Sequence, residues 1–353
     1  MWQKLRAVPT DQLLLIVGLV LVLLALLVQY ERRRKRLPTV KSLPQTWPQR
    51  LWRGLLYALR LLAFAVVSFI LVGGVVMVYV DYQTVTTEIA PAHHPVVRPA
   101  DMTLPVEDVH FTGGDGLTMA SWYLPPQNGA TIILLHGYGG DRAGMLWHVQ
   151  TLYEAGFGVL AYDERASGES EGDYRSFGWE DAADVGGAIA FVHGRSHDNN
   201  HPIGIAGCSI GGQIALQGAA YYPEIGAVWA DGPSVILAKD NPPPQNWAEV
   251  LLVISGYIVD WMYEQRLDVT PPPAMTDIIG DIAPRPIMLV GGGQPHPVFG
   301  TSEKPRINYY AERAGDTAVT WTIEEAYHCD GPARQPDAYA RRMVDFFETT
   351  LLN

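Results

Sequence analysis

The sequence contains only two cysteines, Cys208 and Cys329, and it carries fewer basic than acidic residues. There are 25 Lys and Arg against 37 Asp and Glu, which gives a formal net charge of −12. Two cysteines cannot build the multiple-disulfide framework of a small secreted scaffold. Nucleic-acid binding requires clustered Lys and Arg, so the acidic balance argues against a nucleic-acid partner. With 353 residues, of which 48% are hydrophobic, the chain is long enough for one large domain or two.

Long apolar runs are concentrated in the first hundred residues. Leu13–Val28 is unbroken, and Leu61–Val80 is interrupted only by Ser68 and small residues. The second run is long enough to cross a bilayer, and the first becomes so when its polar flanks are included. A cleaved signal peptide and a buried core helix are the alternatives. However, no small-x-small cleavage site follows the first run, and the second has no polar face. We therefore predict two transmembrane helices, at about residues 11–29 and 61–80.

The basic residues of this region lie mostly between the two runs. They are Arg32, Arg33, Arg34, Lys35, Arg36, Lys41, Arg50 and Arg53. The positive-inside rule therefore predicts a cytoplasmic loop and places both chain ends, including the whole segment that follows the second run, on the extracytoplasmic side. Residues 81–103 contain three prolines and are expected to form an extended tether. The predicted membrane anchor and tether together occupy residues 1–103.

From Leu104 onwards, short apolar segments alternate with segments of helical spacing. Such alternation predicts an α/β domain, residues 104–353, with a mostly parallel sheet covered by helices on both faces. The expected strands are Val106–Thr112, Thr118–Leu124, Thr131–Leu135, Gly158–Tyr162, Ile203–Ala206, Gly226–Ala230, Ile287–Val290 and Val319–Ile323. The expected helices are Arg142–Glu154, Trp179–His193, Ile210–Tyr221, Trp247–Met262, Glu303–Ala314 and Pro336–Leu351.

The stretch from Ile203 to Leu216 combines a strand, a turn of small residues and a helix. The turn contains Gly207-x-Ser209-x-Gly211, the pattern of a nucleophile elbow. The glycines are needed because the strand and helix backbones pass close to each other around a strained serine. The pattern alone is also compatible with an ordinary turn, so it requires a base, an acid and oxyanion donors elsewhere in the chain.

The order of elements and motifs resembles the α/β-hydrolase family from about Leu104 to the C-terminus. His136-Gly137-Tyr138-Gly139-Gly140 follows the third strand, where the family has its oxyanion turn. The segment Asp163–Ser170 is similar to the family's Asp-x-Arg-Gly-x-Gly-x-Ser loop. Ala166 replaces a glycine there, a departure that we expect to be harmless. The resemblance implies a serine hydrolase in which Ser209 is the nucleophile.

The same resemblance assigns the other reacting groups. His328 follows the last strand, at the family's position for the general base, although a surface-loop histidine is the alternative. The backbone N–H groups of Tyr138 and Ile210 would form the oxyanion hole. His136 is expected to shape its turn through side-chain hydrogen bonds.

The acid is where this sequence departs from the family. The usual Gly-x-x-Asp after the strand Ile287–Val290 is replaced by Gly291-Gly292-Gly293-Gln294-Pro295-His296-Pro297, which has no carboxylate. Glu303 is the first carboxylate available after that strand. Asp231 is the rival because it ends the preceding strand, and its alternative role is a structural cap. Both satisfy the chain order Ser–acid–His, and strand position favours Glu303.

Three other features have a functional and a structural interpretation. His193, His197 and His201 are spaced like helical metal ligands, but Gly194 and Asp198–Asn200 favour a polar loop. Cys208 and Cys329 could approach each other in the fold, but two buried thiols are the favoured interpretation. The apolar helix Trp247–Met262 is either a helix covering the sheet or a lid that contacts an acyl chain.

The sequence thus predicts a membrane-anchored serine hydrolase that cleaves an ester, thioester or amide through an acyl-enzyme. Carboxylester hydrolysis is the first choice, and peptidase or acyltransferase activity are variants. The expected partners are a small-molecule or lipid-like acyl substrate and the membrane, with no metal or organic cofactor. The alternative is a catalytically inactive hydrolase domain that acts as a binding module at the membrane, favoured by the missing Gly-x-x-Asp. Substrate identity and oligomeric state are not encoded in these motifs.

Overall fold

The computed structural model describes residues 46–100, 102–196, 201–295 and 302–352. Its contacts divide the chain into two units, Met1–Thr86 and Thr87–Asn353, and each is described by itself below. The division at Thr87 precedes the boundary after residue 103 that the sequence predicts.

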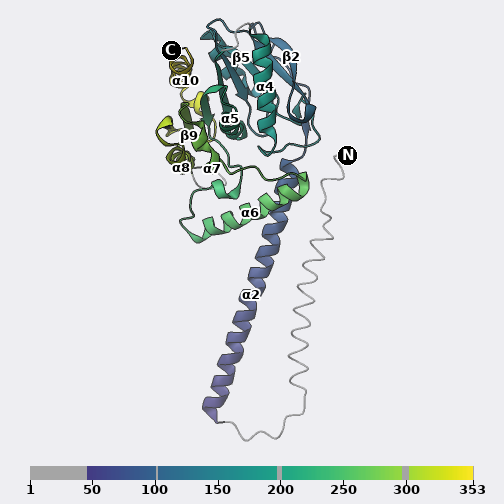
Figure 1. Cartoon of the computed structure of the whole chain (residues 1–353). Helices are drawn as coiled ribbons and strands as arrows, with labels where there is room; N and C mark the ends of the chain where they lie inside the picture. Colours follow the sequence, from purple (N-terminus) through teal and green to yellow (C-terminus); the bar gives the residue numbers. More distant parts are fainter. Residues whose placement is uncertain (1–45, 101, 197–200, 296–301, 353) are drawn as a thin grey trace. The chain divides into compact units, whose positions relative to one another are not determined.

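The described part of the first unit is a single helix, α2 (Trp47–Glu88), whose last two residues belong to the second unit (Figure 1). Its 42 residues include the predicted span 61–80, and large apolar side chains such as Phe69 and Ile70 are exposed along it. Among the described residues, α2 is the one helix long and apolar enough to cross a membrane. The predicted span at residues 11–29 and most of the basic loop lie outside the described residues, so a two-pass topology stays a prediction.

The segment after the predicted span differs from the extended tether that we expected. Helix α2 continues to Glu88, because no proline or glycine occurs between Val80 and Pro91. The strand β1 (Ala92–His93) then pairs in parallel with β6 (Ser167–Gly168). The guanidinium of Arg175 donates to the carbonyl oxygens of Ala90 and Thr87, at 2.7 and 2.8 Å. These contacts attach residues 87–93 to the second unit.

The second unit is built on an eight-stranded sheet in the order β10-β9-β8-β7-β4-β5-β3-β2. Neighbouring strands are parallel from β10 to β5, whereas β3 is antiparallel to both β5 and β2. The strands are β2 (Glu107–Thr112), β3 (Thr118–Leu124), β4 (Thr131–Leu135), β5 (Gly158–Tyr162), β7 (Ile203–Cys208), β8 (Ile225–Asp231), β9 (Ile287–Gly292) and β10 (Ala318–Ile323). All eight overlap with predicted strands, to within two residues at each end, and β1 and β6 are additional.

Helices cover both faces of this sheet, as its parallel strands require (Figure 1). One layer contains α3 (Leu146–Glu154) and α10 (Pro336–Leu351), and the other contains α4 (Asp181–Arg195) and α5 (Ile210–Tyr221). Side chains of β4 alternate between the two: Ile132 and Leu134 join the cluster with α3 and α10, and Ile133 is buried outside that cluster. The remaining helices of more than one turn in the described residues are α6 (Trp247–Leu267) and α8 (Lys304–Ala314).

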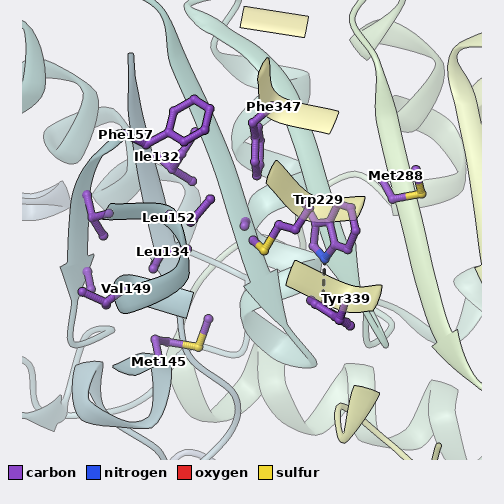
Figure 2. Close-up of a cluster of buried hydrophobic side chains, with 14 of the residues drawn as sticks. Ile132, Leu134, Met145, Val149, Leu152, Phe157, Trp229, Met288, Tyr339 and Phe347 are labelled. Carbon is purple, nitrogen blue, oxygen red and sulfur yellow. Dashed lines mark hydrogen bonds between the residues drawn. The ribbon is translucent and has the colours of Figure 1, made fainter. Parts of the chain in front are cut away.

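A polar network crosses the apolar cluster between the sheet and α10. Figure 2 shows Tyr339 of α10 beneath Trp229 of β8, among side chains such as Phe347 and Met288. The Trp229 indole N–H donates to the Tyr339 hydroxyl, and that hydroxyl donates to Asp231 Oδ2, each at 2.8 Å. All three side chains are buried. Without the tyrosine hydroxyl, the Trp229 N–H and the Asp231 carboxyl group would each lose a hydrogen bond that water could not easily replace.

We expect Tyr339→Phe to lower the free energy of unfolding by about 2 kcal/mol, because it leaves a buried N–H and a buried carboxyl without their partner. Denaturant unfolding of the full chain in detergent, followed by tryptophan fluorescence, measures the difference. Tyr153→Phe is the matched control, since it removes the hydroxyl of a partly buried tyrosine that packs against the same apolar cluster, and we expect a change below about 0.5 kcal/mol. Equal effects of the two substitutions would contradict the role of the network.

Candidate active site

Ser209 lies at a sharp turn between the end of β7 and the start of α5. Its backbone has φ 59° and ψ −118°, a strained conformation for a residue with a side chain. The Ser209 N–H donates to the Asp231 carbonyl at 2.8 Å, which fixes the turn to the neighbouring strand β8. A Cβ atom at Gly207 would collide with the backbone of Gly211, so the flanking glycines are required by close approach. The structure therefore contains the elbow geometry that the sequence pattern predicts.

His328 lies between Ser209 and Glu303. Its Nε2 atom is 2.8 Å from Ser209 Oγ, and its Nδ1 atom is hydrogen-bonded to Glu303 Oε1. A neutral imidazole in this arrangement donates its Nδ1–H to the carboxylate and accepts the serine hydroxyl proton at Nε2. The hydrogen bond to Glu303 raises the pKa of His328 above its ordinary value. The structure thus brings together Ser209, His328 and Glu303.

Glu303 reaches this position because the chain returns to the end of β9. The Glu303 N–H donates to the Gly292 carbonyl at 3.2 Å, and the Gly292 N–H donates to Glu303 Oε2 at 2.8 Å. The neighbouring Gly232 has φ 54°, and a Cβ atom there would lie 2.7 Å from Glu303 Oε1 and 2.9 Å from His328 Nδ1. A residue larger than glycine at position 232 would therefore disturb the pair.

Asp231, the rival acid, is directed elsewhere. Its carboxyl group accepts the Tyr339 hydroxyl in the core, and no hydrogen bond joins it to His328 among the described residues. Burial and the nearby charge of Glu303 together raise the pKa of Asp231 to about 7, although the hydrogen bond from Tyr339 acts in the opposite direction. Its place beneath the site gives it a structural role in the network with Trp229.

The expected oxyanion donors flank the serine. Gly137 lies close to the Ser209 side chain, since a Cβ atom built on it would be 3.5 Å from Ser209 Cβ. The turn that contains Tyr138 is therefore beside Ser209. Ile210 is the first residue of α5, where backbone N–H groups have no partner within the helix. His136 is buried and shapes the turn: Nδ1–H donates to the Gly137 carbonyl at 2.8 Å, and Nε2 accepts the Glu164 N–H at 3.0 Å. Burial lowers the pKa of His136, and these two hydrogen bonds suit a neutral ring protonated at Nδ1.

The segment Asp163–Ser170 has a structural role in this arrangement. Asp163 accepts the backbone N–H groups of Arg142 and Glu169, at 2.7 and 2.9 Å. Arg165 forms a buried ion pair with Asp184 at 2.8 Å. Ala166 has φ 55°, a left-handed conformation that favours glycine. The replacement of glycine by alanine is therefore not harmless, and costs about 1 kcal/mol.

The two cysteines form a disulfide, Cys208–Cys329, so the prediction of two buried thiols is wrong. The sequence did not reveal the pair because 121 residues separate its members. Of the three histidines spaced like metal ligands, His193 lies in α4, His201 is hydrogen-bonded to the Thr131 hydroxyl at 2.8 Å, and His197 lies outside the described residues. Within the described ranges, no group of His, Cys, Asp and Glu is arranged to hold a metal ion.

A cavity of about 450 Å³ opens beside His328 and Glu303. Helix α6 forms one wall with Leu252, Val259 and Tyr263, and the wall also includes Phe177 and Trp179. The other side of α6 is exposed, and it carries large apolar side chains that include Trp247, Leu251, Ile254, Tyr257 and Trp261. This helix therefore does not cover the sheet as a core helix. It lines the cavity, and its role as a lid stays a prediction.

Several residues at this site were not singled out by the sequence. Ser234 lies with its Oγ atom 3.4 Å from Ser209 Oγ, and Tyr263 donates its hydroxyl to Glu88 at 2.6 Å. Asp260 lines the cavity, and burial raises its pKa to about 6. Phe177 has φ 52°, an unusual value for a bulky residue. No motif marks these positions, because each depends on how separate segments meet.

Comparison with known proteins identifies the type of fold to which this architecture belongs. A family model described as the alpha/beta hydrolase fold matches residues 130–279. The esterase Pf2001 of Pyrococcus furiosus superposes with a TM-score of 0.59 at 21% identity, over 74% of this chain and 98% of that chain. The chain has an α/β-hydrolase fold.

Two sequence relatives extend the comparison. The YfhR protein of Escherichia coli (strain K12) is 29% identical over 254 residues, which are 69% of this chain and 81% of YfhR. The polyketide transferase grgF of Penicillium sp. is 31% identical over 144 residues, or 40% of this chain and 49% of grgF. The structure of that transferase superposes with a TM-score of 0.56 at 20% identity, over 71% of this chain and all of that chain.

The choice between Glu303 and Asp231 as the acid can be tested by replacing each carboxylate with its isosteric amide. We expect Glu303→Gln to lower kcat by about a hundredfold or more, because the imidazole loses the charge that stabilises its protonated form. Asp231→Asn should lower kcat far less.

The same variants should differ in the pH dependence of their activity. The base must be neutral, so activity rises with pH through the pKa of His328. The rising limb of the wild-type pH–rate profile should have its midpoint above the ordinary pKa of histidine. Glu303→Gln should shift this midpoint to lower pH, because it removes the carboxylate that raises the pKa of His328. A pH–rate profile of the three proteins on an activated ester measures both effects. A larger loss from Asp231→Asn would contradict the assignment.

Proposed function

We propose that this protein is a membrane-anchored serine hydrolase that cleaves an ester, thioester or amide through an acyl-enzyme. The observation that carries the proposal is the contact of Ser209 Oγ with His328 Nε2 at 2.8 Å, with Glu303 hydrogen-bonded to the opposite ring nitrogen. A serine hydroxyl is a weak nucleophile until a neighbouring base removes its proton. This arrangement supplies that base and the carboxylate that orients it. Carboxylester hydrolysis is the best single assignment.

In the first half of the reaction, Ser209 Oγ attacks the substrate carbonyl carbon while its proton moves to His328 Nε2. The carbonyl oxygen becomes an oxyanion, which the N–H groups of Tyr138 and Ile210 would bind. Collapse of this intermediate breaks the bond to the leaving alcohol, thiol or amine, and that group takes the proton from Nε2. In the second half, His328 removes a proton from water, which attacks the acyl-enzyme. Collapse of the second intermediate breaks the bond to Ser209 Oγ, which takes the proton back from His328 Nε2 and leaves the free acid.

The cavity beside His328 supports a substrate with an apolar portion. Aromatic and aliphatic side chains such as Trp179, Ile236 and Val259 line it, and its volume of about 450 Å³ falls within the usual range of ligand pockets. A lipid-like acyl chain fits this surface chemistry. Transfer of the acyl group to an acceptor other than water would use the same groups. The likeness to a polyketide transferase favours acyl transfer as the second candidate.

The membrane anchor in this proposal is supported by α2, with its exposed apolar side chains and an uncharged run from Leu61 to Val80. The basic loop before it favours an extracytoplasmic catalytic unit. The disulfide Cys208–Cys329 supports the same side, because disulfides persist in oxidising compartments.

The catalytic part of the proposal is tested by covalent labelling. A fluorophosphonate probe should label the detergent-solubilised full chain at Ser209, and Ser209→Ala should abolish both labelling and esterase activity. His328→Ala should reduce both by a comparable factor, since the two residues act as one unit. Ser234→Ala is the matched control: it removes a hydroxyl 3.4 Å from Ser209 Oγ and should keep most of the labelling. A wild-type protein that is folded but not labelled would favour the inactive binding module instead.

The anchoring part is tested separately on membranes. The full chain should remain in the membrane pellet after alkaline carbonate extraction, because an apolar helix of this length inserts stably. Protease added to inverted vesicles should leave the catalytic unit intact, and protease added to right-side-out vesicles should digest it. Extraction into the supernatant would contradict anchoring, and the reverse protection pattern would contradict the orientation.

A further inference from the structure

The disulfide joins the neighbours of the two reacting side chains. Cys208 directly precedes Ser209, and Cys329 directly follows His328. Their Cα atoms are 6.0 Å apart, within the usual range for a disulfide. The chain has no other cysteine, so no competing intramolecular pairing exists. The bridge therefore connects the nucleophile turn directly to the loop that carries the base.

The Cys208 end of the bridge is attached to a rigid part of the molecule. Cys208 is the last residue of β7, a strand in the interior of the sheet with β4 on one side and β8 on the other. It is opposite Asp231 in the register with β8, and the Asp231 carbonyl accepts the Ser209 N–H. The position of this end is fixed by the sheet itself.

The Cys329 end is held much less by the backbone. His328 and Cys329 lie in the loop between β10 and the short helix α9 (Gly331–Arg334). Among the residues the structure describes, no backbone hydrogen bond involves Tyr327, His328 or Cys329. Cys329 also has φ 54°, a left-handed conformation that costs free energy for a residue with a side chain. This loop depends on side-chain ties for its position.

The side-chain ties of the loop fall into two kinds. His328 is hydrogen-bonded to Ser209 and Glu303, but the contact with Ser209 is broken whenever the serine is acylated. The disulfide is covalent and persists through the whole cycle. A displacement of about 1 Å at a catalytic group can cost about a hundredfold in rate.

We propose that the Cys208–Cys329 disulfide positions His328 against Ser209, so that the hydrolase is fully active only when its two cysteines are oxidised. This inference rests on the proposed function. Reduction by a dithiol breaks the S–S bond and forms two cysteine thiols, while the dithiol gives up two electrons and two protons and becomes a cyclic disulfide. The strand β7 keeps its place, and the loop of His328 loses its covalent tie.

The expected consequence is a loss of rate with little loss of substrate affinity. We expect reduction to lower kcat on an ester substrate at least tenfold, and to change KM less than threefold, because the walls of the cavity on α6 are not attached to the bridge. The rising limb of the pH–rate profile should also move to lower pH, since a displaced imidazole loses part of its hydrogen bond to Glu303. A bridge that only stabilised the fold would leave both the limb and the folded-state kcat unchanged.

The test uses the full chain in detergent in three states: as purified under oxidising conditions, reduced by a dithiol, and reoxidised after removal of the dithiol. Thiol titration should give zero, two and zero free thiols per chain, and kcat should fall and then recover. A Cys208→Ala/Cys329→Ala double variant should have the kcat of the reduced wild type and should not respond to the dithiol. Cys208→Ser/Cys329→Ser provides a second, more conservative variant, and circular dichroism checks that each protein is folded.

A folded wild type that contains two free thiols and keeps its full kcat would overturn the positioning role. A folded double variant with wild-type kcat would overturn it equally. Fluorophosphonate labelling of the oxidised protein is measured first, because its absence would remove the proposed function itself, whatever the thiol titration shows. The two failures are therefore distinguishable.

Discussion

The contact between the His328 ring and its two neighbours imposes the main constraint on this structure. Ser209 follows β7, Glu303 returns to the end of β9, and His328 follows β10, so three separate segments must meet within hydrogen-bond distance. Parallel strands make this possible because their carboxyl ends share one edge of the sheet. The core beneath the site, with Trp229, Tyr339 and Asp231 connected in series, fixes β8 between the strands that carry these groups.

Strain and covalent restraint occur together at this edge. Ser209 and Cys329, one from each side of the site, both have left-handed backbone conformations. Such conformations persist only where the surrounding structure enforces them. At Ser209 the enforcing structure is the sheet and the close approach of Gly207 to Gly211. Cys329 is joined by the disulfide to Cys208, the residue before Ser209, so a covalent bond connects the two halves of the site.

The sequence predicted what depends on local pattern. Buried strands such as Thr131–Leu135 and Gly158–Tyr162 were located to the residue, because short continuous apolar runs bounded by turn residues are typical of strands buried on both faces. The sequence could not show that Glu303 reaches His328, because a Gly- and Pro-rich segment separates Glu303 from β9. Its position depends on the hydrogen bonds that it makes with Gly292. The pairing of β1 with β6 involves only two residues per strand, too few for any periodicity, and the continuation of α2 to Glu88 shortened the expected tether. The disulfide was missed because sequence does not give distances between remote residues.

A crystal structure of the fluorophosphonate adduct of the oxidised protein would test the central claim most directly. Phosphorus should be bonded to Ser209 Oγ, with one phosphonyl oxygen within hydrogen-bond distance of the backbone N–H groups of Tyr138 and Ile210. His328 Nδ1 should remain hydrogen-bonded to Glu303, and the Cys208–Cys329 bridge should be intact. An adduct on another residue, or a phosphonyl oxygen directed away from both N–H groups, would contradict the proposed reaction.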